Sequence, residues 1–393
     1  MRRMTTALVL FALAAGPAAQ PRLTLDYAAI AKRLVQQLAL KPGERVISVA
    51  HPGVFEDLLP HIRYEVMRAG GVDLDVLNVL REPVPESFDP GTLQKGARDA
   101  RPIYQAMLRD VDAAIMMPGA TTSHPAYLGM QDVLKADLTE HHGRRTVHFH
   151  WVENGSAYAI PGQPLPERPI IDALYQRALL QTDYSKLGDL QRRFAAAVQA
   201  GETHVTSPQG TDLRFRVGDR PITLMDGDAS AARSARGRVL IDKEVELPAG
   251  VVRVAPLEES VEGVIAFPPS QWDGRAVDGL TLRFSRGRVT EIAARQGKDA
   301  VEAEMQRAGA AGRAFREFAL GLNPLLAVPD RTPWIPYYGY GAGVVRLSLG
   351  DNSELGGAVG GGYVRWNFFT DLTVSIDGQP WVTNGRLNVP SEK

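Results

Sequence analysis

The chain has 393 residues, of which 44% are apolar, and its 44 basic and 45 acidic residues leave a formal charge of −1. So small a charge lacks the electrostatic attraction that binding to nucleic acid or anionic lipid requires, so we expect no nucleic-acid partner. The absence of cysteine excludes disulfides and thiolate metal ligands. A chain of this length favours two domains.

The amino terminus has the features of a secretory signal. Arg2 and Arg3 precede an apolar run over residues 7–15, and small residues follow it. This order is typical of a bacterial-type signal peptide, which we assign to residues 1–20. No apolar run is long enough to span a membrane comfortably. We therefore expect a secreted or periplasmic protein and no integral membrane protein, with a retained amino-terminal anchor as the alternative.

The first half of the chain alternates short apolar strand patterns with amphipathic helical patterns. This alternation predicts a doubly wound α/β domain over residues 21–165 with a largely parallel sheet. No G-x-G-x-x-G motif follows the first strand, so the sequence does not support a dinucleotide site. The predicted strands are residues 45–50, 72–80, 113–117 and 146–151. Three helices are predicted between them: one that ends at residue 68, one near 103–108 and one around 126–135.

After a connection of two predicted helices over residues 166–200, the texture changes to alternating strands and Gly-rich turns. This change predicts a β-rich α+β domain over residues 201–393. The predicted strands are residues 212–217, 251–255, 263–267, 280–285, 344–349 and 372–376, with the clearest helix near 301–307.

Short motifs of the second half occur in an order that resembles the thermophilic metalloaminopeptidases of the aminopeptidase T, aminopeptidase S and PepS type. The resemblance implies an α/β domain followed by a β-rich domain, and often a homodimer. It also implies two divalent metals near the junction, such as zinc, cobalt or manganese, which activate water to release amino-terminal residues from peptides. The motifs are SPQGTDL from Ser207, LPAG from Leu247, APLEESVEG from Ala255, EFALGLNP from Glu317 and LSLGDN from Leu347.

The metal ligands that the resemblance implies are two glutamates, two histidines, a tyrosine and an aspartate. Glu317 keeps one of the two glutamates, but the last histidine of the chain is His204, so no histidine remains in the matching motifs. Valine does not coordinate metal ions, and arginine stays protonated and does not bind cations. The five substituted positions hold Val251, Arg346, Ser353, Arg365 and Asn367.

These substitutions suggest an arginine-lined pocket in place of the metal pair. We hypothesise an ion pair between Glu317 and Arg346 or Arg365, with positive charge left over for a carboxylate or another small anion. The alternative is that the two arginines fill a collapsed site or point to solvent.

A second group of candidate ligands lies in the first half. His148 and His150 alternate on a predicted strand, so they face the same side and could share a metal ion, completed by Glu140, Glu153 or His142. The alternative is a pair of packed strand histidines that bond to their neighbours.

Two further histidines follow predicted strands. His51 and His124 lie in loops that would converge above one edge of the sheet, where they could join the strand histidines around a ligand. The alternative is that they form turns beside their prolines. Asp351 and Glu354, next to a Gly-rich stretch, are expected in a solvated loop.

Three functions remain open from the sequence. We prefer a secreted aminopeptidase homologue that has lost the two-metal site, holds no cofactor, and binds a peptide or small anionic ligand without catalysis. The second is an active metal-dependent aminopeptidase with a site rebuilt from the first-half histidines and Glu317. The third is a mononuclear iron dioxygenase similar to the dihydroxypyridine ring-opening enzymes. The third requires a His-x-Asp pair, which the residues Arg365 and Asn367 do not supply.

Overall fold

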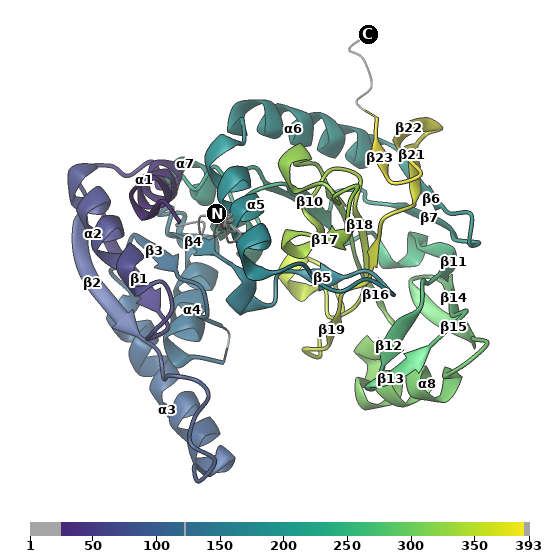
Figure 1. Cartoon of the computed structure of the whole chain (residues 1–393), viewed down its shortest axis with the longest axis horizontal. Helices are drawn as coiled ribbons and strands as arrows, with labels where there is room; N and C mark the ends of the chain where they lie inside the picture. Colours follow the sequence, from purple (N-terminus) through teal and green to yellow (C-terminus); the bar gives the residue numbers. More distant parts are fainter. Residues whose placement is uncertain (1–24, 122, 389–393) are drawn as a thin grey trace, which may run out of the picture.

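The computed structural model describes residues 25–121 and 123–388. The predicted signal peptide, residues 1–20, lies outside the described residues. A parallel sheet with its helices forms one side of the molecule, and antiparallel sheets form the other (Figure 1). Within the described ranges, no helix combines the length and the apolar content that crossing a bilayer requires.

The five-stranded sheet of the first half has the order β2-β1-β3-β4-β9, and all its neighbours are parallel. Its central strands are buried almost throughout, as expected for a sheet covered on both faces. The predicted doubly wound α/β fold is therefore confirmed. The strands are β1 (Arg45–Ala50), β2 (Val72–Asn78), β3 (Ala113–Met116), β4 (Arg145–Phe149) and β9 (Glu244–Leu247).

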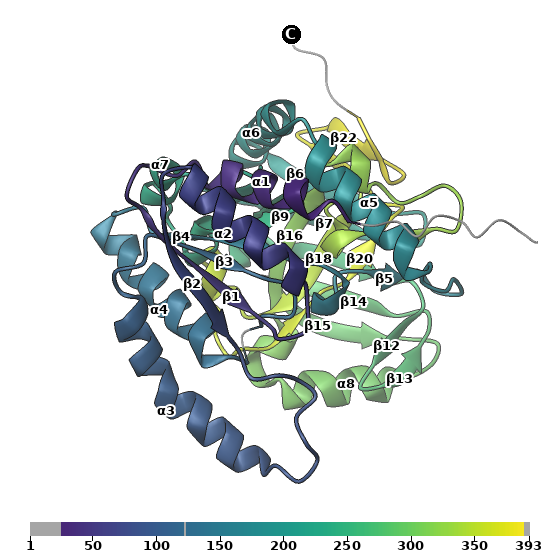
Figure 2. The ribbon, with the colours of Figure 1, turned by 60° about the vertical axis from the view of Figure 1, so that its left-hand side comes forward.

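Two pairs of helices cover the two faces of this sheet, as Figure 2 shows. Alternate residues of β1 and β3 belong to separate apolar clusters: Val46 packs with α1 and α2, whereas Val49 packs with α3 and α4. The sequence did not single out α1, and α3 begins earlier than the helix predicted near its end. The four helices are α1 (Tyr27–Leu38), α2 (Leu59–Arg68), α3 (Pro90–Leu108) and α4 (Pro125–Glu140).

Two helices, α5 (Arg168–Gln181) and α6 (Tyr184–Ala200), connect the halves as predicted. The halves also interlock. β9 comes from the segment predicted to be wholly β-rich, yet it pairs in parallel with β4. The short β5 (Tyr158–Ala159) of the first half likewise pairs with β17 (Trp334–Ile335) of the second half, and this pairing is antiparallel. A sequence division at about residue 201 therefore misses β9, because partners so distant in the chain leave no local signal.

The second half contains two antiparallel sheets, which confirms its predicted β-rich character. One follows the order β19-β18-β16-β10-β8, with β20 also on β18, and the other follows β15-β14-β11-β7-β6-β21-β22-β23. The first sheet comprises β8 (Ile222–Met225), β10 (Val251–Val254), β16 (Phe315–Gly321), β18 (Val345–Gly350), β19 (Val364–Arg365) and β20 (Phe368–Phe369). The second comprises β6 (Glu202–Thr206), β7 (Asp212–Arg216), β11 (Glu262–Ala266), β14 (Thr281–Ser285), β15 (Arg288–Ala293), β21 (Thr373–Ile376), β22 (Gln379–Thr383) and β23 (Arg386–Leu387). The remaining elements are α7 (Ala231–Ala235), α8 (Lys298–Arg307) and the hairpin of β12 (Ser270–Trp272) and β13 (Arg275–Val277).

The end of β16 is held against the rest of the molecule by backbone contact and by a buried amide. The Nδ2 group of Asn323 donates to Thr182 Oγ1 (2.9 Å) and to the carbonyl of Ala249 (2.7 Å). A Cβ atom added to Gly321 would lie 2.1 Å from the carbonyl oxygen of Gly341. Only glycine therefore fits at the end of β16.

We predict that Gly321→Ala lowers the free energy of unfolding by about 1–3 kcal/mol, because the added methyl group forces apart backbone that has no room to move. Urea denaturation followed by circular dichroism measures the change. The matched control is Gly96→Ala in α3, where an added Cβ meets nothing within 4 Å. The control should cost nothing, since alanine favours the helix. Equal stability of the two variants would contradict this account.

Candidate functional site

The three central strands of the first antiparallel sheet bring charged side chains to one face. Arg253 on β10 and Arg346 on β18 both lie opposite Ala319 of β16. Directly opposed residues, and residues two positions along a strand, share a face. Glu317 is two positions from Ala319, so its carboxylate lies on the same face as both arginines.

Glu317 is fully buried and bonded through both oxygens. Its Oε1 accepts from Arg346 Nε (2.7 Å) and lies 2.5 Å from Arg346 Nη2, while its Oε2 accepts from Arg253 Nη2 (2.8 Å). Burial by itself raises the pKa of Glu317, but the adjacent guanidinium groups outweigh burial and hold that pKa far below its ordinary value. The predicted ion pair between Glu317 and Arg346 is confirmed.

The network continues through a second carboxylate. Glu354 Oε1 accepts from Arg253 Nη2 (3.3 Å) and also from Arg316 Nη2. Arg316 is 1% exposed and lies next to Glu317 along β16, with 3.6 Å between its Nη2 and Glu317 Oε2. As expected, Glu354 lies in the loop after β18 with its side chain 40% exposed, and from there it contacts the buried Arg253 and Arg316.

The other substituted positions take structural roles. Val251 is buried in β10 between β8 and β16. Ser353 Oγ donates to Asp351 (2.6 Å), and Asn367 Nδ2 donates to the carbonyl of Leu347 (3.0 Å). These side chains stabilise strand and loop.

Arg365 does not reach Glu317. It bonds to Glu304 (2.8 Å) and to the carbonyl of Gln271, and its guanidinium stacks 3.5 Å above the ring of Trp272. The alternative ion pair between Glu317 and Arg365 is therefore wrong. A flat aromatic face and a nearby carboxylate hold this cation elsewhere.

The residues around Glu317 do not fit a pair of divalent cations. Both of its oxygens already accept hydrogen bonds from arginine, and Arg253, Arg316 and Arg346 all have a nitrogen within 3.6 Å of it. Three guanidinium groups at this range repel a cation, whereas metal sites of this kind use imidazoles and free carboxylates. The ligand chemistry that the resemblance implies is absent from this face.

His148 lies on β4 and His150 directly follows it at the junction, beside the buried Glu244 and the half-buried Glu246 of β9. His148 pairs in register with Glu246, and His148 Nε2 lies 3.8 Å from Glu244 Oε1. Tyr127 of α4 contacts His148 Nδ1 through its hydroxyl (3.0 Å), and Gln131 Nε2 donates to Glu244 (2.9 Å). These polar side chains form a layer, the polar layer, where α4 meets β4 and β9.

Burial sets the protonation states of this layer. It lowers the pKa of His150 to about 4 and, together with the neighbouring His150, holds the pKa of His148 well below its ordinary value. Burial also raises the pKa of Glu244 to about 8. It raises the pKa of Glu246 against the opposing charges of Arg253 and Arg346. Near pH 7, the two histidines and Glu244 are therefore neutral.

The residues expected to complete a metal site with His148 and His150 lie elsewhere. Glu140 and His142 precede β4 and contact each other (3.2 Å), while Glu153 pairs with Arg168 (2.8 Å). That expectation is wrong: Glu140 and His142 lie at the start of β4, away from His150 at its end, and Glu153 is paired with Arg168.

His51 and His124 come together as a pair, with ring centroids 6.5 Å apart. Within the described ranges, the ring contacts of His148 and His150 are instead to each other, to Tyr127 and to Tyr338. The loop histidines therefore form a separate feature.

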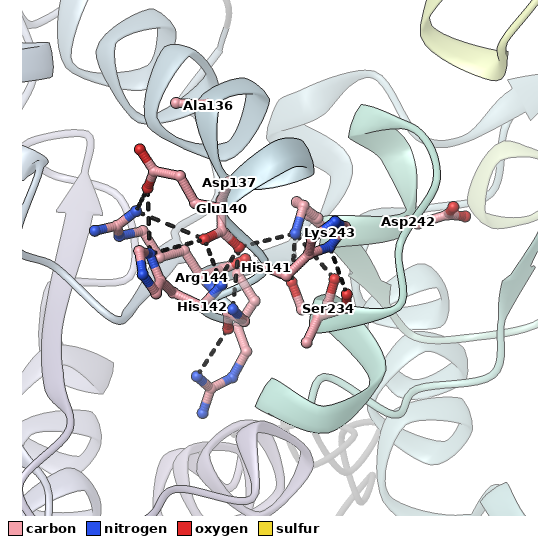
Figure 3. Close-up of polar contacts among 12 residues, drawn as sticks. Ala136, Asp137, Glu140, His141, His142, Arg144, Ser234, Asp242 and Lys243 are labelled. Atoms are coloured by element: carbon pink, nitrogen blue, oxygen red, sulfur yellow. Dashed lines mark hydrogen bonds and ion pairs between the residues drawn. The ribbon is translucent and has the colours of Figure 1, made fainter.

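Among the described residues, one group brings three potential metal-ligand atoms within 4.8 Å of one another: Asp137, Glu140 and His142. Figure 3 shows Asp137 surrounded by donors. Its carboxylate accepts from Lys243 Nζ (2.8 Å) and from the backbone N–H groups of residues 142 (2.9 Å), 143 (3.1 Å) and 144 (2.9 Å). Arg144 also bonds to Glu140. The adjacent cations disfavour a metal ion. These bonds are better explained as a structural contact that holds the end of α4 and the turn after it against Lys243.

Sequence reasoning missed four charged residues of the junction: Arg253, Arg316, Glu244 and Glu246. A signal existed for three of them. Arg253 interrupts the apolar strand VVRV two positions after Val251, and Glu244 and Glu246 alternate in EVEL. Charges on one face of short buried strands indicate a polar interface.

Comparisons with known proteins show a family match over part of the chain and a shared fold. Residues 187–325 match the thermophilic metalloprotease (M29) family. No curated protein sequence matches the chain. The chain resembles the solved structure of 2,5-dihydroxypyridine dioxygenase from Pseudomonas putida KT2440, with a TM-score of 0.60, 15% identity and coverage of 93% of this chain and 97% of that one. It also resembles wild-type AmpT from Thermus thermophilus, with a TM-score of 0.57, 18% identity and coverage of 92% and 98%. At these identities the two structures establish the shared fold.

We predict that Glu244→Gln changes how stability depends on pH. The folded-state pKa of Glu244, about 8, lies above the value of about 4.3 for an unfolded glutamate. The protonated carboxyl group of Glu244 therefore adds to the free energy of unfolding. This stabilisation is fully present below about pH 4.3 and is lost as the pH rises to about 8, because the unfolded chain releases the proton at a lower pH than the folded chain does. Relative to the variant, the wild type should lose up to about 1.4 kcal/mol per pH unit in this window, measured by urea denaturation.

The lowered pKa values of His148 and His150 act in the opposite direction and destabilise both proteins in acid. The difference between wild type and variant therefore isolates Glu244. Parallel pH profiles for the two proteins would show that Glu244 ionises normally.

We predict that Lys243→Met destabilises the fold by about 3 kcal/mol, because it leaves the carboxylate of Asp137 buried without its counter-charge. Both side chains of this pair are 0% exposed. The control is Lys95→Met, which breaks an exposed pair with Asp99 and should cost less than about 1 kcal/mol. Thermal unfolding of both variants measures the contrast, and similar losses would refute it.

Proposed function

As a member of the thermophilic metalloprotease (M29) family, this chain has the fold without most of the metal ligands that the resemblance implies, and we propose that it is a non-catalytic, anion-binding homologue. The observation that carries this proposal is the saturated carboxylate of Glu317. One oxygen is bonded to Arg346 and the other to Arg253. A catalytic metal would have to displace both arginines from a site that is 0% exposed.

The charges of the junction favour an anion. In these ion pairs three guanidinium groups, those of Arg253, Arg316 and Arg346, contact two carboxylates, those of Glu317 and Glu354, so the cations outnumber their paired carboxylates. Burial of an unbalanced cation is costly, so a bound anion would stabilise the site. Arginine suits a carboxylate in particular, because its planar fork matches the two oxygens.

Several buried polar atoms at the junction have no hydrogen-bond partner within the described part of the chain. They are Arg253 Nε, Arg316 Nε, Ser348 Oγ, His148 Nε2 and His150 Nδ1. Unmade bonds of this kind are costly and normally have a partner. They support a polar ligand or ordered water in this layer.

A cavity of about 500 Å³ gives access to part of the network. Its lining includes Arg316, Glu354 and Gln131, and Gln131 bonds to Glu244. A small carboxylate that enters here would find Arg316 in the wall, together with the exposed cations of Lys135 and Arg238. The volume is that of a small-molecule site, which lies between about 300 and 1,000 Å³.

The proposal also includes where the protein is located, its ligand and its oligomeric state. The charged and apolar order of residues 1–20 supports a secreted or periplasmic protein. A peptide is a possible source of the carboxylate, through its carboxyl terminus, and a homodimer follows from the resemblance.

One observation favours a second function, a metal-dependent aminopeptidase with a rebuilt site. His148 is neutral, its Nε2 has no partner among the described residues, and Glu244 lies 3.8 Å away. Zinc sites in proteins need at least three ligands. Within the described ranges His148, His150 and Glu244 do not bring three ligand atoms within 4.8 Å, so this function ranks second.

We predict that the purified protein holds less than stoichiometric metal and does not release p-nitroaniline from aminoacyl-p-nitroanilides in added cobalt, zinc or manganese. Inductively coupled plasma mass spectrometry and the absorbance assay measure the two quantities. Stoichiometric metal, together with turnover that His148→Ala or Glu317→Ala abolishes, would establish the rebuilt site and refute the non-catalytic reading.

The anion is tested with a matched pair of probes, N-acetylalanine and its neutral amide. We expect the carboxylate to raise the melting temperature, since a ligand at 100 times its dissociation constant contributes about 2.7 kcal/mol. The amide should have no effect, because it lacks the charge that the arginines require. An equal effect of both probes would contradict an anion site.

A further inference from the structure

A second cavity, of about 830 Å³, lies in the first half of the chain, away from the charged network. It opens where β2 ends and α4 begins, under α3. In the sheet order β2-β1-β3, the connection from β1 to β2 and the connection from β2 to β3 run in opposite directions across the sheet. In open α/β sheets, ligands bind outside the carboxyl ends of the strands near such a reversal.

Most of the cavity wall is apolar. Leu77 and Val79 come from the end of β2, Leu93 and Ala97 from α3, and Pro125 from the start of α4. Its volume lies within the range of about 300–1,000 Å³ that is typical of small-molecule sites, which combine apolar walls with few polar groups.

Close packing of α3 on α4 fixes the shape of the cavity. A Cβ atom added to Gly129 of α4 would lie 2.8 Å from the Cβ of Tyr104 on α3. Arg101 of α3 forms a two-pronged ion pair with Asp132 of α4 (2.6 and 2.5 Å). Although α3 projects from the body of the molecule in Figure 1, these contacts hold it over the cavity.

The cavity contains one buried polar group without a partner. His124 is 4% exposed and lines the cavity, and its Nε2 has no hydrogen-bond partner in the described ranges. Its Nδ1 accepts from the backbone N–H of Thr121 (3.3 Å), which places the proton of a neutral ring on Nε2. Burial lowers the pKa of His124 despite the opposing charge of Glu82, so the ring is neutral near pH 7. The wall therefore offers the Nε2–H group of His124 as an uncharged donor, beside the polar side chains of Asn78, Thr92, Gln94 and Ser123.

The charge of the wall excludes an anion. Glu82 is the one ionisable acid or base among the lining residues besides His124 and Tyr104, and its carboxylate lies 3.8 Å from His124 Nε2. His51 Nε2 accepts from the backbone N–H of Glu82 (3.0 Å) and so fixes the loop that carries this carboxylate. No lysine or arginine lines the cavity to balance a second negative charge.

We propose that this cavity is a binding site for a small neutral molecule with an apolar body and one carbonyl-type oxygen, which accepts a hydrogen bond from His124 Nε2. The apolar body would lie against the residues of β2 and α3. The site shares neither charge nor lining residues with the arginine network, so it stands whether or not that network binds an anion.

The test uses prodan, a neutral naphthalene with a ketone, and diphenylhexatriene, an apolar probe with no acceptor. We expect saturable prodan fluorescence with one probe per chain. Gly96→Phe should abolish it, because Gly96 lines the cavity and its Cβ direction is open space within α3. Arg98→Phe adds the same ring to α3 outside the lining and should leave binding intact. Circular dichroism confirms that each variant is folded.

His124→Phe tests the hydrogen bond. It keeps an aromatic ring but removes the donor, so prodan should bind about fivefold to tenfold more weakly. Binding of diphenylhexatriene should change little. The proposal is overturned if prodan does not saturate, if Gly96→Phe and Arg98→Phe bind it equally, or if a carboxylate analogue of prodan binds more tightly than prodan.

Discussion

The buried carboxylate of Glu317 between two arginines is the interaction on which the centre of this protein depends. Arg253 and Arg346 approach it from the two neighbouring strands, so one ion network spans β10, β16 and β18. Removing a single partner would leave a charge in the protein interior, which costs several kcal/mol. The three residues therefore constrain one another, and a cation has no place among them.

Outside the arginine network, the buried polar side chains of the junction are mostly uncharged. Burial makes His148 and His150 neutral and holds the proton of Glu244 up to about pH 8. Neutral groups cost less to bury than ions. Among the described residues of the junction, charge is thus concentrated in the arginine network, while α4 bonds to the polar layer through Tyr127, which contacts His148, and Gln131, which donates to Glu244.

Much of the fold could be predicted from the sequence, because period-two and helical apolar patterns are local. The strands of the parallel sheet and the two connecting helices were recognisable in this way. The strand β9 was not, since its four residues pair with β4 across about a hundred positions of the chain. At the site, the pairing of Glu317 with Arg346 was foreseen, whereas Arg253 was missed because its partner is 64 residues away.

By itself, the sequence determined what chemistry is missing. A chain without histidine after His204 and with valine at position 251 does not supply the ligands of a two-metal site there, however it folds. Tertiary structure decided what replaced that chemistry. In the folded chain, Glu317 pairs with Arg253 and Arg346, and Arg365 pairs with Glu304. Glu244 lies where burial raises its pKa, so that its carboxyl group stays protonated near pH 7. Residue types are fixed in the chain, but ion pairs and pKa values depend on distances and burial that exist only once the strands have paired.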